Sequence, residues 1–207
     1  LGVLTHFDKA PLAQTQSLQL LSSRDGDAWD RPSNQALCGP GEVGEWDRFQ
    51  IMLTGAPPIA VADRLLIYYR GTSRRHNKVP REYEPHIDAD QQHNSMSIGV
   101  ATLRLDGFAS VAGSFDVGHV MTKPFQLQGD TLLVNTKADH GRLRVELLDA
   151  AEQPLPGYTL DNCLAVQQDS VAAAVRWGAD GRQRLPTQPL RLRFELTNAR
   201  LYSYWCA

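Results

Sequence analysis

The sequence has no long hydrophobic run and little net charge, and each of these two features argues against certain classes of partner. No apolar run approaches the roughly 18 residues that a bilayer-spanning helix needs, so we expect no membrane as a partner. The formal net charge of -2 gives no electrostatic reason to expect nucleic acid or an anionic membrane surface as a partner. With 207 residues, the chain is long enough for one large domain or two small ones.

Cysteine is also scarce. The three cysteines are Cys38, Cys163 and Cys206, and no two of them have the spacing of zinc ligands. We therefore expect no metal site and no cofactor. The odd number leaves two alternatives open: one disulfide with a free thiol, for which Cys163 and Cys206 are the first pair to test, or three reduced cysteines.

Segments with a helical hydrophobic period are missing as well, and the apolar residues follow strand patterns instead. The fold class expected from this pattern is all-β. Short runs of strand-forming residues, separated by Gly and Pro, predict strands at residues 17–23, 49–54, 59–61, 64–70, 97–103, 131–136, 141–148, 171–177 and 190–196.

The stretch 97–111 predicts the boundary between two domains, at residues 1–104 and 105–207. Residues 97–103 form the last predicted strand of the first domain, and a new strand is expected to begin at Phe108. Between them, Asp106-Gly107 predicts a tight turn, because glycine accepts the positive φ angle that such turns often require.

The second domain has a clean two-residue alternation, which predicts strands with one dry face and one solvated face, as in a two-sheet sandwich. The inward positions expected in strands 141–148 and 190–196 are Leu143, Val145, Leu147, Leu190, Leu192, Phe194 and Leu196. The outward positions are Arg142, Arg144, Glu146, Arg191, Arg193 and Glu195.

Four segments of the first domain, SSRDGDAWDRP, EWDRFQIMLTGAPPI, DRLLIYYRG and IGVATLRLDGFASV, resemble the last blades of a known architecture. They are similar to the five-bladed β-propellers of the glycosidase clan that includes invertases, levanases and arabinanase-like enzymes. The segments KPF, LLVN, GRLRVELLDAAEQPLPGY and LRLRFELTNARLYSY resemble the β-sandwich that follows such propellers. The resemblance implies one to two C-terminal propeller blades followed by a β-sandwich.

The resemblance also implies a function, as the C-terminal portion of a secreted or periplasmic glycoside hydrolase that acts on a poly- or oligosaccharide. Such enzymes need a pair of carboxyl groups that flank the glycosidic bond. In the clan these groups come mostly from earlier blades, so we expect most of the catalytic carboxylates to lie outside this chain. The alternative is a non-catalytic carbohydrate-binding or structural β-sandwich module.

Candidate site residues lie around the two strands 49–54 and 64–70. Asp47, just before the first of these strands, is the candidate catalytic carboxylate, and its alternative role is that of a turn residue that caps backbone amides. Arginine and histidine suit sugar hydroxyls, carboxylates and sulfates, although they also occur as solvated charge clusters on loops. The candidate substrate-binding residues are Arg48, Gln50, Arg70, Arg74 and His76.

Other residues are weaker candidates. His86 and His93 share the polar segment 71–94 with His76, but their spacing does not favour a metal site. Trp29 and Trp46 suit stacking on sugar rings, although tryptophans more often pack between sheets. An exposed aromatic row in the second domain, among Trp177, Tyr202, Tyr204 and Trp205, would indicate a carbohydrate-binding face.

The strands 49–54 and 64–70 are apolar enough to require covering surface. If the propeller is incomplete, this surface comes from another polypeptide. We therefore expect as partners, besides carbohydrate, the remainder of the protein's own precursor or a second subunit. The pocket would then form at that interface, with Asp47, Arg70 and His76 facing it.

Overall fold

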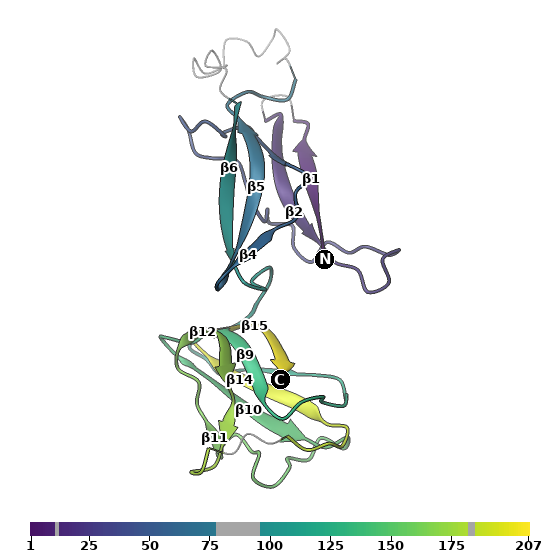
Figure 1. Cartoon of the computed structure of the whole chain (residues 1–207), viewed down its shortest axis with the longest axis vertical. Coiled ribbons are helices and arrows are strands. Elements are labelled where there is room, and N and C mark those ends of the chain that lie inside the picture. Colours follow the sequence, from purple (N-terminus) through teal and green to yellow (C-terminus); the bar gives the residue numbers. More distant parts are fainter. Residues whose placement is uncertain (11–12, 78–95, 182–184) are drawn as a thin grey trace. The chain divides into compact units, whose positions relative to one another are not determined.

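The computed structural model describes residues 1–10, 13–77, 96–181 and 185–207 (Figure 1). The chain is all-β, as predicted: 49% of the described residues are strand, and none of them is helical. None of the sheets that these residues form is closed. Accordingly, no helix in the described part is long and apolar enough to cross a membrane. The chain divides into two compact units, a first unit of Leu1–Leu103 and a second unit of Arg104–Ala207.

One six-stranded sheet makes up the framework of the first unit. Its order is β1-β2-β3-β5-β4, and β6 also pairs with β5. The strands are β1 (Gly2–Asp8), β2 (Thr15–Leu21), β3 (Gln50–Leu53), β4 (Ile59–Val61), β5 (Arg64–Thr72) and β6 (Met96–Arg104). All strands predicted in this region are present, β4 with its predicted ends and the others with shifted ends. Strand β1 was not predicted, because its apolar residues do not alternate cleanly along the sequence.

Strands β3 and β4 pair with successive parts of β5. Leu53 pairs with Tyr69, and Ile59 pairs with Leu66. The residues between them include Gly55, with a φ of 83°, and two prolines, which cannot donate to a ladder. The interruption is therefore local, and the side chains of β3 and β4 still alternate between the two faces of the sheet.

The strands of the second unit form three sheets. Their orders are β10-β14-β8, β12-β9-β15-β7 and β11-β13. The strands are β7 (Val111–Gly113), β8 (Gly118–Met121), β9 (Leu132–Lys137), β10 (Arg142–Leu148), β11 (Cys163–Leu164), β12 (Asp169–Ala174), β13 (Arg176–Trp177), β14 (Arg191–Thr197) and β15 (Ala199–Cys206).

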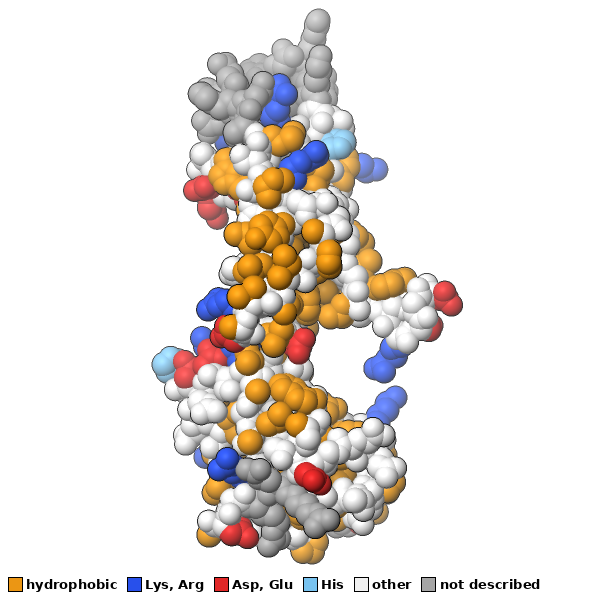
Figure 2. Space-filling view, in the orientation of Figure 1, with side chains coloured by type: hydrophobic (Ala, Val, Ile, Leu, Met, Phe, Trp, Pro, Cys, Tyr) orange, Lys and Arg blue, Asp and Glu red, His pale blue; other side chains and the backbone are white. Residues whose placement is uncertain are grey.

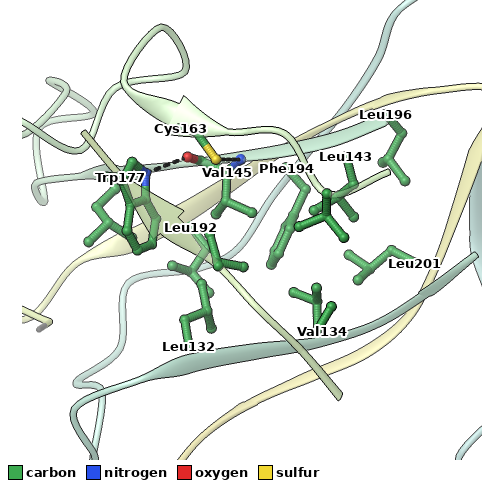
Figure 3. Close-up of a cluster of buried hydrophobic side chains, with 14 of the residues drawn as sticks. Leu132, Val134, Leu143, Val145, Cys163, Trp177, Leu192, Phe194, Leu196 and Leu201 are labelled. Carbon is green, nitrogen blue, oxygen red and sulfur yellow. Dashed lines mark hydrogen bonds between the residues drawn. The ribbon is translucent and has the colours of Figure 1, made fainter. Parts of the chain in front are cut away.

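Side chains from all three sheets share one hydrophobic core (Figure 3). The seven predicted inward residues of β10, β14 and the position before β14 are all buried, at 0 or 1% exposure, which confirms that part of the alternation. Two hydrogen bonds to the backbone of Val145 fix the polar atoms in this core. The Trp177 indole donates to the Val145 carbonyl over 2.8 Å, and the Val145 N–H donates to the Cys163 sulfur over 3.2 Å.

The prediction that the other face of these strands is solvated is wrong for two of its six residues. Glu146 is 2% exposed and Glu195 is 6% exposed. Each lies across the ladder from an arginine, Glu146 from Arg193 and Glu195 from Arg144. Both pairs are ion pairs, and Arg144 Nη2 lies 2.7 Å from Glu195 Oε1. Opposite charges in register thus allow both carboxylates to be buried.

The turn after β6 also differs from its prediction. The positive φ angle, 52°, falls on Asp106 rather than Gly107, and the next strand begins at Val111 rather than Phe108. Glycine is needed at position 107 for a different reason. A Cβ atom there would lie 2.7 Å from the Arg104 Cβ and 2.9 Å from the Arg104 carbonyl oxygen.

The cysteines are all free, so the pairing of Cys163 with Cys206 is not formed. Cys163 lies in the core, where burial raises the pKa of its thiol. His86 and His93 lie outside the described residues. Within the described ranges, no group of three or more His, Cys, Asp or Glu side chains has a metal-binding arrangement.

Candidate functional site

A pocket of about 440 Å³ lies beside β3 and β5 in the first unit. Four of the six predicted site residues line it: Gln50, Arg70, Arg74 and His76. The other described lining residues are Met52, Thr72, Arg75, Asn77 and Met96. The described lining thus has three arginines and a histidine but no carboxylate, so it is a cationic pocket.

The pairing of β3 with β5 sets which side chains point toward this pocket. Gln50 pairs with Thr72, and Met52 pairs with Arg70. Paired residues of an antiparallel ladder project to the same face, and alternate residues of one strand do so too. These four side chains therefore share one face of the sheet, which we call the pocket face.

Two hydrogen bonds hold the segment that leaves β5. The Gln50 side-chain amide donates to the Arg74 carbonyl over 2.6 Å, and the Arg74 N–H donates to the Thr72 hydroxyl over 3.2 Å. Gln50 is buried, so its role in the pocket is to position the backbone of Arg74. The side chain of Arg74 is itself exposed.

His76 joins the same segment to the N-terminal hairpin. The backbone N–H of His76 donates to the Gln14 carbonyl over 3.0 Å, and the centre of the His76 ring lies 4.7 Å from that of the Phe7 ring. The Nδ1 atom of His76 lies 3.1 Å from Asn77 Oδ1. The Phe7 ring and the Asn77 side chain thus both contact the imidazole at the rim of the pocket.

The remaining arginines lie around Met52 and Phe49. The Arg70 guanidinium Nη2 lies 3.2 Å from the Met52 sulfur. The guanidiniums of Arg48 and Arg75 lie 4.9 and 4.3 Å from the centre of the buried Phe49 ring. Arg75 lines the pocket, whereas the predicted residue Arg48 is not part of the described lining.

Asp47 lies on the opposite face of the sheet from the pocket. Its Oδ2 accepts a hydrogen bond of 2.7 Å from the Tyr69 hydroxyl, and Tyr69 alternates with Arg70 along β5. Asp47 is only 8% exposed. The structure therefore separates Asp47 from Arg70 and His76, contrary to the predicted grouping of the three around one pocket.

The surroundings of Asp47 are closely packed. The Trp46 ring stacks on the Tyr69 ring at 5.8 Å with an angle of 11°. Glycine is required at position 71, because a Cβ there would lie 2.5 Å from the Asp47 Cβ and 2.7 Å from the Trp46 ring. Burial, followed by the hydrogen bond to Asp47, raises the pKa of the Tyr69 hydroxyl, so it remains a donor at neutral pH. Asp47 thus has a structural partner.

The aromatic candidates are not gathered at the pocket. Trp46 packs on Tyr69, and Trp29 is 47% exposed, with its indole N–H bound to the Gly26 carbonyl over 2.9 Å. In the second unit, Tyr204 and Trp205 are exposed by about a third but alternate along β15, so they project to opposite faces. They do not form the aromatic row that would indicate a carbohydrate-binding face.

Five lining residues were not predicted: Met52, Thr72, Arg75, Asn77 and Met96. Arg75 and Asn77 adjoin predicted residues, and their proximity in sequence was a usable signal. Thr72 and Met52 follow from the β3–β5 register, which the sequence does not specify. Met96 comes from β6, whose start lies far along the chain from the rest of the pocket.

The pocket thus combines charged, amide, hydroxyl and thioether side chains from β3, β5 and β6 and from the segment after β5. Comparison with protein-family models, curated proteins and solved structures finds no match, so the resemblance to propeller glycosidases stays a prediction.

Proposed function

We propose that the first unit binds an acidic carbohydrate, with the anionic group of the ligand in the cationic pocket. One observation carries the proposal: Arg70, Arg74, Arg75 and His76 surround a pocket whose described lining contains no carboxylate. Guanidinium groups bind carboxylates and sulfates through paired, charge-assisted hydrogen bonds. Arg70 and Arg74 are exposed and reach solvent, where a ligand would meet them.

The rest of the lining fits a sugar. Asn77 supplies an amide for neutral sugar hydroxyls, and Met52 and Met96 supply apolar surface. The hydrogen bond from Gln50 fixes the backbone of Arg74 before any ligand arrives. A prearranged site of this kind loses less conformational entropy on binding.

A catalytic role for Asp47 has weaker support than binding. Hydrolysis of a glycoside needs two carboxyl groups that flank the scissile bond. Asp47 is buried, bonded to Tyr69 and on the other face from the pocket. We therefore propose that this chain contributes binding to a secreted or periplasmic glycoside hydrolase whose catalytic carboxylates lie in another part of the protein. The chain alone should not hydrolyse aryl glycosides, and turnover abolished by Asp47→Asn would contradict this.

The proposal also includes an architecture for each unit, a β-sandwich for the second and propeller blades for the first. The shared core between sheets β10-β14-β8 and β12-β9-β15-β7 supports a β-sandwich in the second unit, which would act as a scaffold. Support for propeller blades in the first unit is limited to the sequence resemblance. Its sheet has six strands and a parallel β2–β3 pair, whereas a propeller blade has four strands.

Binding to polygalacturonate, dextran sulfate and neutral dextran, measured by isothermal titration calorimetry, tests the carbohydrate proposal. We expect the two anionic polymers to bind, more weakly as salt is added, and dextran not to bind. Losing a charge-assisted hydrogen bond costs about 1.5–3 kcal/mol, so Arg70→Gln should weaken binding by roughly 10–100-fold. Arg64→Gln, at the other end of β5, is the matched control. Equal binding to dextran, or binding that Arg70→Gln leaves unchanged, would refute the proposal.

A further inference from the structure

A row of apolar side chains on β4, β5 and β6 is exposed in the single chain. We call these residues the apolar sheet face, and each is between 38 and 64% exposed: Ile59, Val61, Tyr68, Met96, Ile98 and Val100. Figure 2 shows hydrophobic side chains gathered over β5 and β6. A contiguous exposed patch of this kind commonly marks an interaction site.

The register places these residues on one face of the sheet. Ile59 pairs with Leu66, which shares a face with Tyr68 two residues further along β5. On β6, a Cβ at Gly99 would lie 2.5 Å from the Tyr69 ring, so Gly99 faces the same side as Tyr69. Ile98 and Val100 therefore project to the other side, with Tyr68. Met96 lies where this face meets the cationic pocket.

The size of the face suits a pair of identical chains. Six large side chains that are about half exposed present on the order of 500 Å² of surface, near the upper end for a patch on a monomer. Two copies packed face to face would bury on the order of 1,000 Å², the size at which specific interfaces begin. The six residues themselves carry no charge, and the exposed Arg64, which pairs with Val61, borders them on the same face.

The pocket end of the face is cationic, whereas the other end carries one charge of each sign, on Asp63 and Arg64. Arg70 and Arg74 lie at the pocket end, and Asp63 lies in the turn between β4 and β5 at the other end. The Asp63 side chain is 63% exposed, and among the described residues its one ion-pair partner is the exposed Arg64, at 3.8 Å. In a two-fold arrangement with antiparallel β5 strands, Asp63 of each copy would meet the arginines of the other.

From these observations we propose that the apolar sheet face is the interface of a symmetric homodimer. A second copy of this chain packs on Ile59, Val61, Tyr68, Ile98 and Val100, with antiparallel sheets. The interface shares Arg70 and Arg74 with the cationic pocket, but its central residues, Ile98 and Val100, do not line the pocket, so a change at Ile98 tests the dimer separately from carbohydrate binding. The arginines of the pocket lie at its rim.

Sedimentation velocity on the intact chain between 1 and 100 µM tests the dimer. We expect a concentration-dependent shift from 23.0 kDa to twice that mass. Ile98→Asp should weaken dimerisation at least tenfold, because it places a charge at the centre of an apolar interface. Since Ile98 is 64% exposed in the single chain, this variant should keep its fold, which circular dichroism can verify. Val43→Asp, at a valine that is 75% exposed outside the face, is the matched control.

A charge reversal tests the antiparallel orientation. Asp63→Arg should weaken the dimer severalfold, and adding Arg70→Asp should restore it. A chain that stays at 23.0 kDa up to 100 µM would overturn the proposal, and so would a dimer that Ile98→Asp leaves unchanged. If a different polypeptide covered the face and the chain alone stayed monomeric, the second copy would be excluded as the occupant.

Discussion

The two units have nearly equal lengths, but they bury very different kinds of side chain. In the second unit, large apolar side chains from three sheets form one core, with Trp177, Phe194 and Leu143 fully buried. In the first unit, the buried apolar residues are few, and polar side chains such as Gln50 and Asp47 are buried beside them. The second unit therefore has the means to fold by itself, and the first unit has the exposed features that suit binding.

The surfaces that the first unit exposes lower its stability relative to that of the second unit. Its single sheet presents a cationic pocket and the apolar sheet face to solvent instead of packing them against a second sheet. Each large side chain left exposed forgoes about 1.5–3 kcal/mol of burial. A unit built in this way gains stability from ligands or partners that cover it.

Separating the units should give the largest effect. We expect residues 105–207 to unfold cooperatively in urea, because their core is complete within the unit. Residues 1–104 should show no cooperative transition when expressed alone. Circular dichroism of both fragments measures this. A cooperative transition from the N-terminal fragment would show that its small core suffices, and the contrast between the units would then fail.

Truncating one phenylalanine in each unit sharpens the comparison within the intact chain. Phe194→Ala should lower the free energy of unfolding by about 4 kcal/mol, because rigid neighbours leave a cavity. Phe49→Ala should cost about 2 kcal/mol, because the flexible guanidinium side chains of Arg48 and Arg75 can move into the space. Urea titrations of both variants provide the values. Equal losses would indicate that the two sites are equally rigid.

Strand identity was predictable from the sequence wherever the two-residue period was clean. Phe194 and Leu143 were assigned to the core correctly, because alternation in β10 and β14 fixes which face is dry. The burial of Glu146 was not predictable, since it depends on Arg193 lying directly across the ladder. Register between strands distant in sequence is a tertiary property that the local pattern does not contain.

The candidate site was predictable only as far as it is local in sequence. Arg70, Arg74 and His76 follow one strand, and they line one pocket. Asp47 was grouped with them because it precedes the neighbouring strand. It lies on the other face, where its carboxylate accepts a hydrogen bond from the Tyr69 hydroxyl. A shift of one position along a strand reverses the face, so proximity in sequence is a poor guide to it.

Removing one partner of an ion pair should also affect the stability of the two units differently, although by less than the phenylalanine truncations do. Glu195→Ala should cost about 2 kcal/mol, because it leaves the Arg144 guanidinium half-buried without its closest carboxylate. In the first unit, Asp63→Ala should cost at most about 0.5 kcal/mol in the monomer, since both side chains of the Asp63–Arg64 pair are exposed. Urea titration of both variants, at a protein concentration at which the chain is monomeric, measures the two losses in the free energy of unfolding. A loss above 1 kcal/mol for Asp63→Ala would contradict this ranking.

The smallest effect concerns the hydrogen bond between Tyr69 and Asp47. Tyr69→Phe should lower the free energy of unfolding by about 1 kcal/mol at pH 7, because the buried carboxylate of Asp47 loses its donor. Tyr68→Phe is the control, since Tyr68 is exposed on the other face and its change should stay within about 0.5 kcal/mol.

The same pair of variants has an alkaline signature. Burial, and then Asp47, raise the pKa of Tyr69, so the folded chain keeps the hydroxyl proton where the unfolded chain loses it. That contribution to stability is complete below the pKa of an unfolded tyrosine, about 10, and is lost as the pH rises above it. The gap in stability between the wild type and Tyr69→Phe should therefore narrow above pH 10. A gap that stays constant between pH 7 and pH 11 would show that the hydroxyl is not held protonated by its surroundings.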